Sequence, residues 1–320
     1  MIIKLRTREL IWGGGEVFLF ELLEEFIRQG HEVSLAASIR SQLFAKAKFL
    51  NLRAGVIIKP DLVVCNDFRS VWKSLLLELP KNRVFVVHGK WQLSKVRVLI
   101  CKIFRVRLFA VNADLSARAY RLGAPEVAIL PIGRLSQGQP SENQARATTR
   151  SYTFASVARL DPVKRLSLYK TFCESQKAKA LLVTYAPVSE DQSKIANELS
   201  TSENSQLEVI FDGDASWAWR CGQFFVNTSS YESLGISMLE ALANGLPVIA
   251  TDSDGAREIL LGELSAGIAE PTVEGLTAAY KRLKEVIDSP SAYRYWQAAQ
   301  KVLDSRGPEK CAHLLIEACR

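Results

Sequence analysis

Histidine is scarce in this sequence, with three residues in 320, and none of the six cysteines forms a CxxC pair. Structural zinc sites depend on such pairs or on histidines at short, fixed spacing, so neither a zinc finger nor a multi-histidine metal centre is expected. The cysteines are therefore interpreted as free, buried thiols in a reducing compartment.

Long apolar runs are also missing. No stretch approaches the roughly 18 residues that a membrane-spanning helix needs, and the first fifteen residues lack the continuous apolar segment of a signal peptide. We therefore expect a cytoplasmic protein. Apolar residues make up 48% of the chain, enough for packed cores rather than disorder. A chain of 320 residues is long for one core, so two domains are expected.

Acidic residues are few in the first half of the chain. Residues 1–145 hold 22 Lys and Arg against 12 Asp and Glu, a balance of +10, and the remainder holds 19 against 22, a balance of −3. A basic first half predicts an acidic surface or substrate as its partner. Nucleic acid is not the expected partner, because the basic residues are not interleaved with aromatic ones and no recognition motif is present.

Short apolar runs alternate with helical patterns along the first half. The expected strands are residues 1–5, 32–37, 62–65, 84–87, 108–111 and 127–130. Residues 16–29 carry apolar side chains at helical spacing and end at Gly30, so they predict a helix between the first two strands. A strand, a glycine-rich loop, a helix and a second strand form a βαβ unit.

The same alternation returns in the second half. Expected strands are residues 152–157, 180–184, 208–211, 224–226 and 247–250, and expected helices are residues 235–244, 273–287 and 291–303. Residues 137–150 are polar and turn-rich, as interdomain linkers are. The predicted fold class is therefore α/β, with two Rossmann-like doubly wound domains facing across a cleft.

The predicted boundaries follow from the linker. We assign residues 1–140 to an N-terminal acceptor-side domain and residues 141–300 to a C-terminal donor-binding domain. We expect a C-terminal helix, about residues 301–320, to pack back on the first domain.

The most informative segment runs from Tyr231 to Glu258, YESLGISMLEALANGLPVIATDSDGARE. It holds Glu232 and Glu240 in the spacing E-x7-E, and eight helical residues rise roughly 12 Å. That distance matches the reach from the ribose to the hexose of a nucleotide sugar. The helix start at Leu234 and Gly235 offers unpaired amides and a positive dipole end to the pyrophosphate between them.

A basic segment, ARLDPVKR, follows the expected strand 152–157. Its Arg159 and Lys164 form a candidate diphosphate clamp, in which Arg binds through its planar fork and Lys acts as a point charge. Fixed cations at this place would stabilise the charge that grows on a departing nucleoside diphosphate.

Taken together, these motifs resemble the retaining glycosyltransferases of family 4, the glycosyl transferases group 1, which have the GT-B fold. The resemblance implies that Arg159 and Lys164 bind the donor phosphates, that Glu232 contacts the donor hexose and that Glu240 binds the ribose. Gly245 to Asp252, GLPVIATD, matches the segment that follows in the family. The resemblance is strong over residues 155–260 and weaker before them.

The first half resembles the family at two places. Gly14 and Gly15 belong to a GG-x-E loop, which the resemblance places beside the donor phosphate and the acceptor. The loop is not a G-x-G-x-x-G fingerprint, so no dinucleotide cofactor is expected. His88 follows an apolar run, where the family commonly has a histidine near the donor sugar, although Gly89 and Lys90 follow it here in place of an Asp.

The expected activity is transfer of a hexose from a UDP- or GDP-sugar to a glycan, glycolipid or small molecule, in cell-surface polysaccharide or lipopolysaccharide synthesis. His88 and Glu232 are the expected catalytic residues, and neither a metal ion nor another cofactor is expected. Two alternatives stay open: a nucleotide-sugar epimerase of the same fold, and a non-catalytic scaffold with this fold.

Residues 95–107, KVRVLICKIFRVR, form a basic amphipathic pattern, with Val96, Leu99 and Ile103 on one side and lysines and arginines on the other. Basic amphipathic helices bind anionic membranes, which would place the protein peripherally on the cytoplasmic face. The favoured interpretation is that the apolar side packs on the domain's own sheet and leaves the basic side in solvent.

Overall fold

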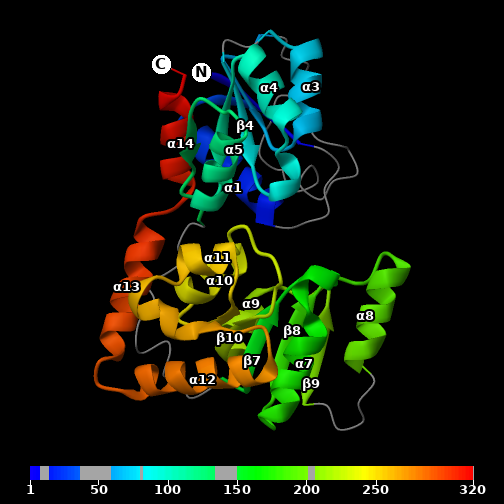
Figure 1. The fold of residues 1–320 in the computed structure, drawn as a ribbon, viewed down its shortest axis with the longest axis vertical. Coiled ribbons are helices and arrows are strands. Elements are labelled where there is room, and N and C mark those ends of the chain that lie inside the picture. Colours follow the sequence, from blue (N-terminus) through cyan, green and yellow to red (C-terminus); the bar gives the residue numbers. More distant parts are fainter. Residues whose placement is uncertain (8–13, 37–58, 80–81, 134–149, 201–205, 320) are drawn as a thin grey trace. The chain divides into compact units, whose positions relative to one another are not determined.

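The chain divides into two compact units, Met1–Leu135 with Arg306–Arg320, and Ser136–Ser305 (Figure 1). The computed structural model describes residues 1–7, 14–36, 59–79, 82–133, 150–200 and 206–319. The predicted linker, residues 137–150, lies outside the described residues except for Arg150. That arginine is buried and donates hydrogen bonds to the carbonyls of Gly222, Asn244 and Gly245, so it belongs to the second unit rather than to a solvated linker.

In the described part of the first unit, a six-stranded parallel sheet has the order β2-β1-β3-β4-β5-β6. Its strands are β1 (Ile2–Arg6), β2 (Glu32–Ala36), β3 (Leu62–Cys65), β4 (Asn82–Val87), β5 (Val106–Ala110) and β6 (Val127–Ile129). Its helices are α1 (Gly14–Arg28), α3 (Phe68–Leu77), α4 (Lys95–Ile103), α5 (Ala113–Arg121) and α14 (Pro308–Glu317), with a 3₁₀ turn, η2 (Lys90–Gln92). Because crossover connections are right-handed, α1 lies on one face of the sheet and α3, α4 and α5 lie on the other.

The end of the chain returns to the first unit. Two helices were expected here, residues 291–303 and about residues 301–320, and the structure has α13 (Ala292–Asp304) and α14 (Pro308–Glu317). They are separated at Gly307, whose φ of 140° and following proline break the helix. The Gly307 amide donates to the Pro131 carbonyl at 2.8 Å. From there α14 lies beside α1 and buries Cys311 and Leu315 (Figure 1).

The second unit holds, within its described residues, a six-stranded parallel sheet of order β12-β11-β10-β7-β8-β9. Its strands are β7 (Tyr152–Val157), β8 (Ala180–Thr184), β9 (Leu207–Phe211), β10 (Gly222–Asn227), β11 (Val248–Thr251) and β12 (Ile268–Ala269). Its helices are α7 (Leu166–Ser175), α8 (Glu190–Ser200), α9 (Ser216–Cys221), α10 (Ile236–Ala243), α11 (Asp254–Ile259), α12 (Val273–Asp288) and α13, with 3₁₀ turns η3 (Pro162–Lys164) and η4 (Gly262–Gly267). The predicted α/β class with two doubly wound domains is confirmed.

The segment 95–107 differs from its prediction in length and in orientation. The helix α4 ends at Ile103, Arg105 has a φ of 51°, and Val106 and Arg107 already belong to β5. The residues that α4 buries are Val98 and Cys101. Its exposed residues include Val96, Leu99 and Ile103, at 65%, 55% and 63% exposure. The favoured interpretation, with the apolar side on the sheet, is therefore wrong.

All six cysteines are free, as expected from the sequence, but only four of them are buried, since Cys221 and Cys319 are half-buried. Burial raises the pKa of the Cys101 and Cys311 thiols to about 12, so both are neutral at physiological pH. None of the helices in the described residues is both long enough and apolar enough to cross a membrane.

Candidate functional site

The second sheet has a topological switch point between β7 and β10. From β7 the chain proceeds outward through β8 to β9, and from β10 it proceeds the other way through β11 to β12. Ligands of open parallel sheets bind beyond the carboxyl ends of the strands at such a point. The two loops that leave it are residues 158–165, after β7, and residues 228–235, after β10.

Hydrogen bonds join these two loops directly. The Ser230 amide donates to the Val163 carbonyl at 2.7 Å, and the Thr228 hydroxyl donates to the Lys164 carbonyl at 2.8 Å. Asp161 accepts from the Val163 amide at 3.0 Å and so starts the short turn η3. Since the carbonyls on both sides of Lys164 are held, the position of its side chain is fixed by the β10 loop.

An ion pair lies where the loops meet. Lys164 Nζ donates to Glu232 Oε2 at 2.6 Å, and the two side chains are 17% and 16% exposed. The Ser229 hydroxyl donates to the same oxygen at 3.1 Å. An ammonium group has three N–H donors, so Lys164 keeps donors for a second anion after it binds Glu232. The arrangement can hold a phosphate and a hydroxyl-bearing sugar side by side.

Close packing fixes the loop that carries Glu232. The Glu232 carbonyl accepts from the Gly255 amide at 2.7 Å. A Cβ on Gly255 would lie 2.8 Å from both that carbonyl oxygen and the oxygen of Leu234, so only glycine fits. At Gly235 the φ is 79°, and a Cβ there would meet Met238 Cε at 2.2 Å and Glu232 Cγ at 3.0 Å. The absence of a side chain at both glycines therefore allows the Glu232 loop to pack closely against α10 and α11.

The helix α10 begins directly after Gly235, and no side chain caps its first turn. Its leading amides lie next to the Glu232 loop, as the predicted pyrophosphate site requires. Glu240 lies in the second turn of this helix and is half-buried. The 12 Å estimate between Glu232 and Glu240 assumed continuous helix, but only residues 236 to 240 of that span are helical.

Arg159 lies on the β7 loop with Lys164. Its side chain is 40% exposed, and its guanidinium is 4.0 Å from Asp161 Oδ2, a distance at the edge of ion pairing. The guanidinium is therefore loosely held and accessible to an anion. Among the described residues, no three His, Cys, Asp or Glu side chains gather as metal ligands would.

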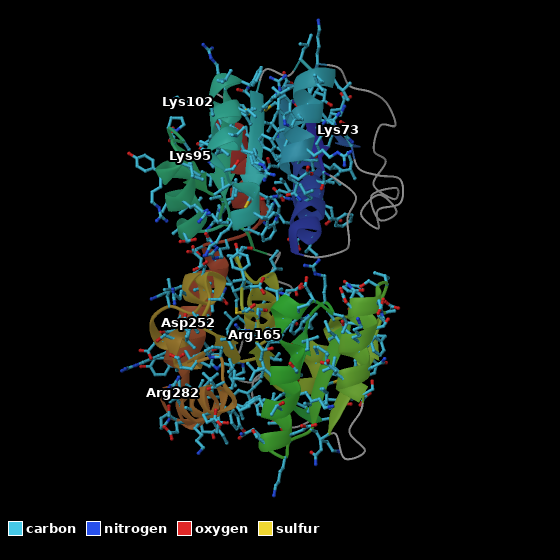
Figure 2. All side chains as sticks on the ribbon, turned by 45° about the vertical axis from the view of Figure 1, so that its right-hand side comes forward. Lys73, Lys95, Lys102, Arg165, Asp252 and Arg282 are labelled. Carbon is cyan, nitrogen blue, oxygen red and sulfur yellow. The ribbon has the colours of Figure 1, made fainter. Side chains whose placement is uncertain are left out.

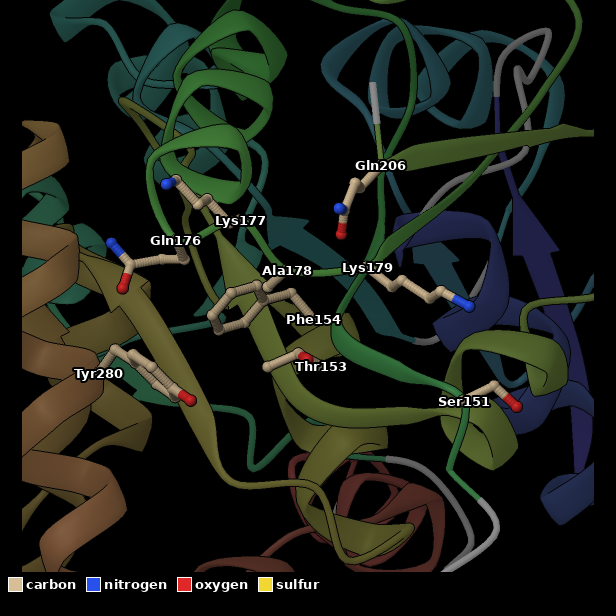
Figure 3. A pocket seen from close by; sticks show the side chains of 9 residues that line it. All are labelled: Ser151, Thr153, Phe154, Gln176, Lys177, Ala178, Lys179, Gln206 and Tyr280. Carbon is tan, nitrogen blue, oxygen red and sulfur yellow. The ribbon is translucent and has the colours of Figure 1, made fainter. Parts of the chain in front are cut away.

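Two hollows lie at opposite ends of the second sheet. A small one of about 10 Å³, room for about one water molecule, is lined by Lys164, Asn227, Thr228 and Ser229 at the carboxyl ends of the strands. A larger one of about 390 Å³ lies at the amino ends of β7, β8 and β9, where Thr153, Lys179 and Gln206 line it (Figure 3). Among the described residues no carboxylate lines the larger hollow, which lies at the opposite end of the sheet from the switch point, so we assign the site to the carboxyl ends.

The first unit has its own switch point, between β1 and β3. Gly14 is the first residue of α1. A Cβ on Gly15 would lie 3.5 Å from Asn66 Nδ2 and 4.0 Å from His88 Nδ1. Asn66 follows β3 and His88 follows β4, so three chain segments bring these residues together at the carboxyl ends of the strands.

Two polar atoms in this group are buried without a hydrogen-bond partner in the described structure, Asn66 Oδ1 and His88 Nε2. Unpaired buried polar atoms are rare in folded proteins, and a bound ligand or water is one way in which such atoms are satisfied. Phe18 lies 5.7 Å from the His88 ring, centroid to centroid. Burial lowers the pKa of His88 to about 4, so its ring is neutral at physiological pH.

The structure thus gathers the sequence-predicted residues into two groups. Lys164, Glu232, Leu234 and Gly235 lie together in the second unit with Arg159 on the same loop, and Gly15 and His88 lie together in the first. Sequence reasoning missed Ser229 and Asn66. Asn66 directly follows β3, and Ser229 lies two residues after β10. A polar residue at the carboxyl end of a strand was the sequence signal available for each.

The model of one protein family, Glycosyl transferases group 1, matches residues 139–302. Sulfoquinovosyl transferase SQD2 of Arabidopsis thaliana is 27% identical over 157 residues, which are 49% of this chain and 28% of that protein. The chain therefore matches little more than a quarter of the length of that relative.

Solved glycosyltransferase structures share the fold over nearly the whole chain. A glycosyltransferase from Rickettsia africae has a TM-score of 0.79 at 14% identity, over 99% of this chain and 97% of that one. Anabaena HepE, solved with UDP-glucose, has a TM-score of 0.74 at 16% identity, over 99% of each chain. Sucrose-phosphate synthase from Thermosynechococcus elongatus has a TM-score of 0.74 at 16% identity, over 99% of this chain and 98% of that one. At these identities the likeness establishes the two-domain GT-B fold.

Proposed function

The chain belongs to the glycosyl transferases group 1 family, and we propose that it is a retaining hexosyltransferase of family 4. The donor is a nucleotide sugar. The acceptor is a glycan, a glycolipid or a small molecule, and cell-surface polysaccharide or lipopolysaccharide synthesis is the setting that we favour.

The observation that carries this proposal is the Lys164–Glu232 ion pair at the switch point of the second sheet. Both hydrogen bonds described for the Glu232 carboxylate go to Oε2, from Lys164 and from Ser229. We assign Oε1 to a hexose hydroxyl. The remaining donors of Lys164 then face the phosphate that is bonded to that hexose.

Charge stabilisation of the leaving group is the main task of the second unit in this proposal. Lys164, Arg159 and the amides at the start of α10 bind the diphosphate, whose negative charge grows as the glycosidic bond breaks. Glu240 binds the ribose. Because these positive groups stabilise the charge on the leaving diphosphate, we propose that transfer needs no metal ion.

The first unit supplies groups to the hexose and the acceptor. A neutral His88 can both donate and accept a hydrogen bond, which suits a sugar hydroxyl. Gly14 and Gly15 let the backbone approach the donor phosphate. The acceptor hydroxyl attacks from the same face as the leaving diphosphate, and no side chain is assigned as a nucleophile.

Among donors, UDP-sugars have the most support. Anabaena HepE was solved with UDP and with UDP-glucose and shares this fold. GDP-sugars remain the second choice that the sequence allows. The cited relative from Arabidopsis thaliana is named for transfer of a sulfoquinovosyl group, so a modified hexose is a further candidate to test.

A thermal-shift screen with UDP, GDP and ADP, and with their sugars, tests the donor first. Saturation at 100 times Kd adds about 2.7 kcal/mol of stability, so a bound nucleotide gives a clear shift. We expect one nucleotide family to bind and EDTA to leave the shift unchanged. Transfer products are then analysed by NMR, where a retained anomeric configuration is expected. An inverted product, or an epimerised donor formed without acceptor, would contradict the proposal.

A further inference from the structure

The helix α3 buries mainly polar residues and exposes large apolar ones, the reverse of an ordinary surface helix. The residues that it buries are Ser70, Val71 and Ser74, two of them serines. Trp72 and Leu76 point outward, at 42% and 78% exposure. Ordinary surface helices bury their apolar side and expose polar residues. A helix with serines inside and large apolar residues outside has a second apolar environment on its outer side.

The neighbouring helix α4 repeats this arrangement. Val98 and Cys101 face the sheet. At 100° per residue, Val96, Leu99 and Ile103 cluster on the opposite side of the helix, and all three are more than half exposed. Both helices of this face therefore turn apolar side chains outward.

Arg97 of α4 links α3 to the turn η2. The Arg97 guanidinium of α4 lies 5.3 Å from the centre of the Phe68 ring at the start of α3, and it donates to the Trp91 carbonyl at 2.6 Å. Trp91 is itself 67% exposed. Figures 1 and 2 show α3 and α4 side by side in the first unit. We call this the α3–α4 surface; its exposed apolar residues are Trp72, Leu76, Trp91, Val96, Leu99 and Ile103.

The concentration of apolar side chains here is high. Of the eighteen large hydrophobic residues exposed in the described structure, nine lie between Trp72 and Phe104. Large exposed apolar patches mark sites that bind proteins, ligands or membranes. The surface is therefore a candidate binding site, and the charges around it indicate the kind of partner that would fit.

The charges around the surface are mostly positive, although Asp67 caps the start of α3 and Asp114 pairs with Lys90 at 3.6 Å. Residues 68–107 hold ten Lys and Arg and a single acid, Glu78. That acid is buried and bound to Lys4 and Arg6, so it does not offset the surface charge. Lys73, Lys95 and Lys102 project from α3 and α4 (Figure 2). Apolar side chains flanked by lysines fit the interface of an anionic bilayer, where the lysines reach phosphates and the apolar groups enter the acyl region.

We propose that the α3–α4 surface docks the first unit on an anionic lipid bilayer. A second copy of the chain fits less well, because pairing the same surface would bring two sets of cations together. This inference does not depend on the sugar chemistry. If both hold, membrane docking favours a lipid-linked acceptor among the acceptor classes proposed above.

Flotation of the purified chain with vesicles tests the proposal. We expect binding to phosphatidylcholine vesicles that contain phosphatidylglycerol, weak binding to phosphatidylcholine alone, and release by salt. Each cation near an anionic surface contributes about fivefold in affinity, so Lys95→Ala with Lys102→Ala should weaken binding about 25-fold. Leu76→Ser with Leu99→Ser should weaken it about tenfold or more.

The matched control lies in the second unit, where Val188 is 78% exposed and the Lys194 side chain is 63% exposed. Val188→Ser with Lys194→Ala should bind vesicles like the original chain. Quenching of tryptophan fluorescence by brominated lipids, lost in Trp72→Phe with Trp91→Phe, gives a second readout on stable protein.

Three results would overturn membrane docking: no binding to anionic vesicles, equal binding by the surface variants, or a lipid-free dimer that those variants dissociate. The nucleotide thermal shift is measured on every variant. An unchanged shift reports an intact fold and donor site, so failure of docking is separated from failure of the proposed function.

Discussion

Lys164 has the clearest energetic role of any residue in the proposed function, because its single charge contacts Glu232 and is proposed to bind a donor phosphate. We predict that Lys164→Met weakens binding of the nucleoside diphosphate about 10- to 100-fold, the usual value of a hydrogen bond between charged groups. Isothermal titration calorimetry measures this change in affinity, with the nucleotide that stabilises the chain in the thermal-shift screen.

A matched control for this variant is Lys194→Met, since Lys194 also pairs with acids but lies exposed on α8. Its nucleotide affinity should equal that of the original chain. Equal affinities in all three proteins would remove Lys164 from the donor site. A loss in both variants would instead reflect the net charge.

His88 offers a prediction about protonation. Burial lowers its pKa from 6.5 to about 4. The folded chain therefore binds fewer protons at His88 than the unfolded chain between these values, and the stability from this group declines as the pH falls from about 6.5 to about 4. In NMR titrations the His88 ring signals should stay constant from pH 8 to pH 5.5. Loss of the constant signals in His88→Gln assigns them, and a His88 midpoint near 6.5 would contradict the burial argument.

At the scale of the element, Gly235 decides how α10 begins. Gly235 and Gly30 have the same φ of 79°, but a Cβ on Gly30 would meet nothing within 4 Å. Alanine at either place adopts a left-handed conformation that costs roughly 1 kcal/mol or more. Gly235→Ala must also displace Met238 or Glu232. We predict that Gly235→Ala loses more stability than Gly30→Ala in thermal unfolding, and that only Gly235→Ala weakens nucleotide binding.

Because both glycines have the same φ, the difference between the two variants measures the effect of the contacts with Met238 and Glu232 alone. If both variants lose equal stability and both keep full nucleotide affinity, the Glu232 loop tolerates the movement of its neighbours. The loop would then not hold the Glu232 carboxylate in the position that donor binding requires.

Elements were predictable from sequence where pattern and burial agree. The runs 62–65, 152–157 and 180–184 are strands over those same residues, because buried parallel strands are rich in apolar residues. The orientation of helices α3 and α4 could not be predicted in this way. Periodicity shows that a helix has an apolar side, but it does not say whether that side faces the sheet or another partner.

The candidate site was predictable only in part. Glu232, Glu240, Arg159 and Lys164 were identified from recognisable sequence motifs. The position of Ser229 after a strand marked it only as a polar residue near the site, and did not indicate that it would bind Glu232. Asn66 lies between an apolar strand and a helix cap, Asp67, and its neighbours His88 and Gly15 are distant in the chain. Such contacts depend on strand order, which local patterns do not give.

At the scale of the whole molecule, the two units should respond differently to ligand and to mutation. The last helix, α14, belongs to the first unit, and its Leu315 is fully buried there, as Leu283 of α12 is in the second unit. Leucine-to-alanine changes at such sites cost about 2–5 kcal/mol. Because the donor site proposed above lies mainly in the second unit, nucleotide should raise the unfolding temperature of that unit more than that of the first.

We therefore predict two calorimetric transitions that ligand and mutation assign independently. Leu283→Ala should lower the transition that nucleotide raises, and Leu315→Ala should lower the other. Each variant serves as the control for its partner, since the substitutions are chemically identical and equally buried. A single transition that both substitutions lower equally would mean that the units unfold as one body. Stabilisation of the Leu315-sensitive transition by nucleotide would instead move the main donor contacts to the first unit, where Asn66 Oδ1 and His88 Nε2 are among the buried polar atoms without a hydrogen-bond partner in the described residues.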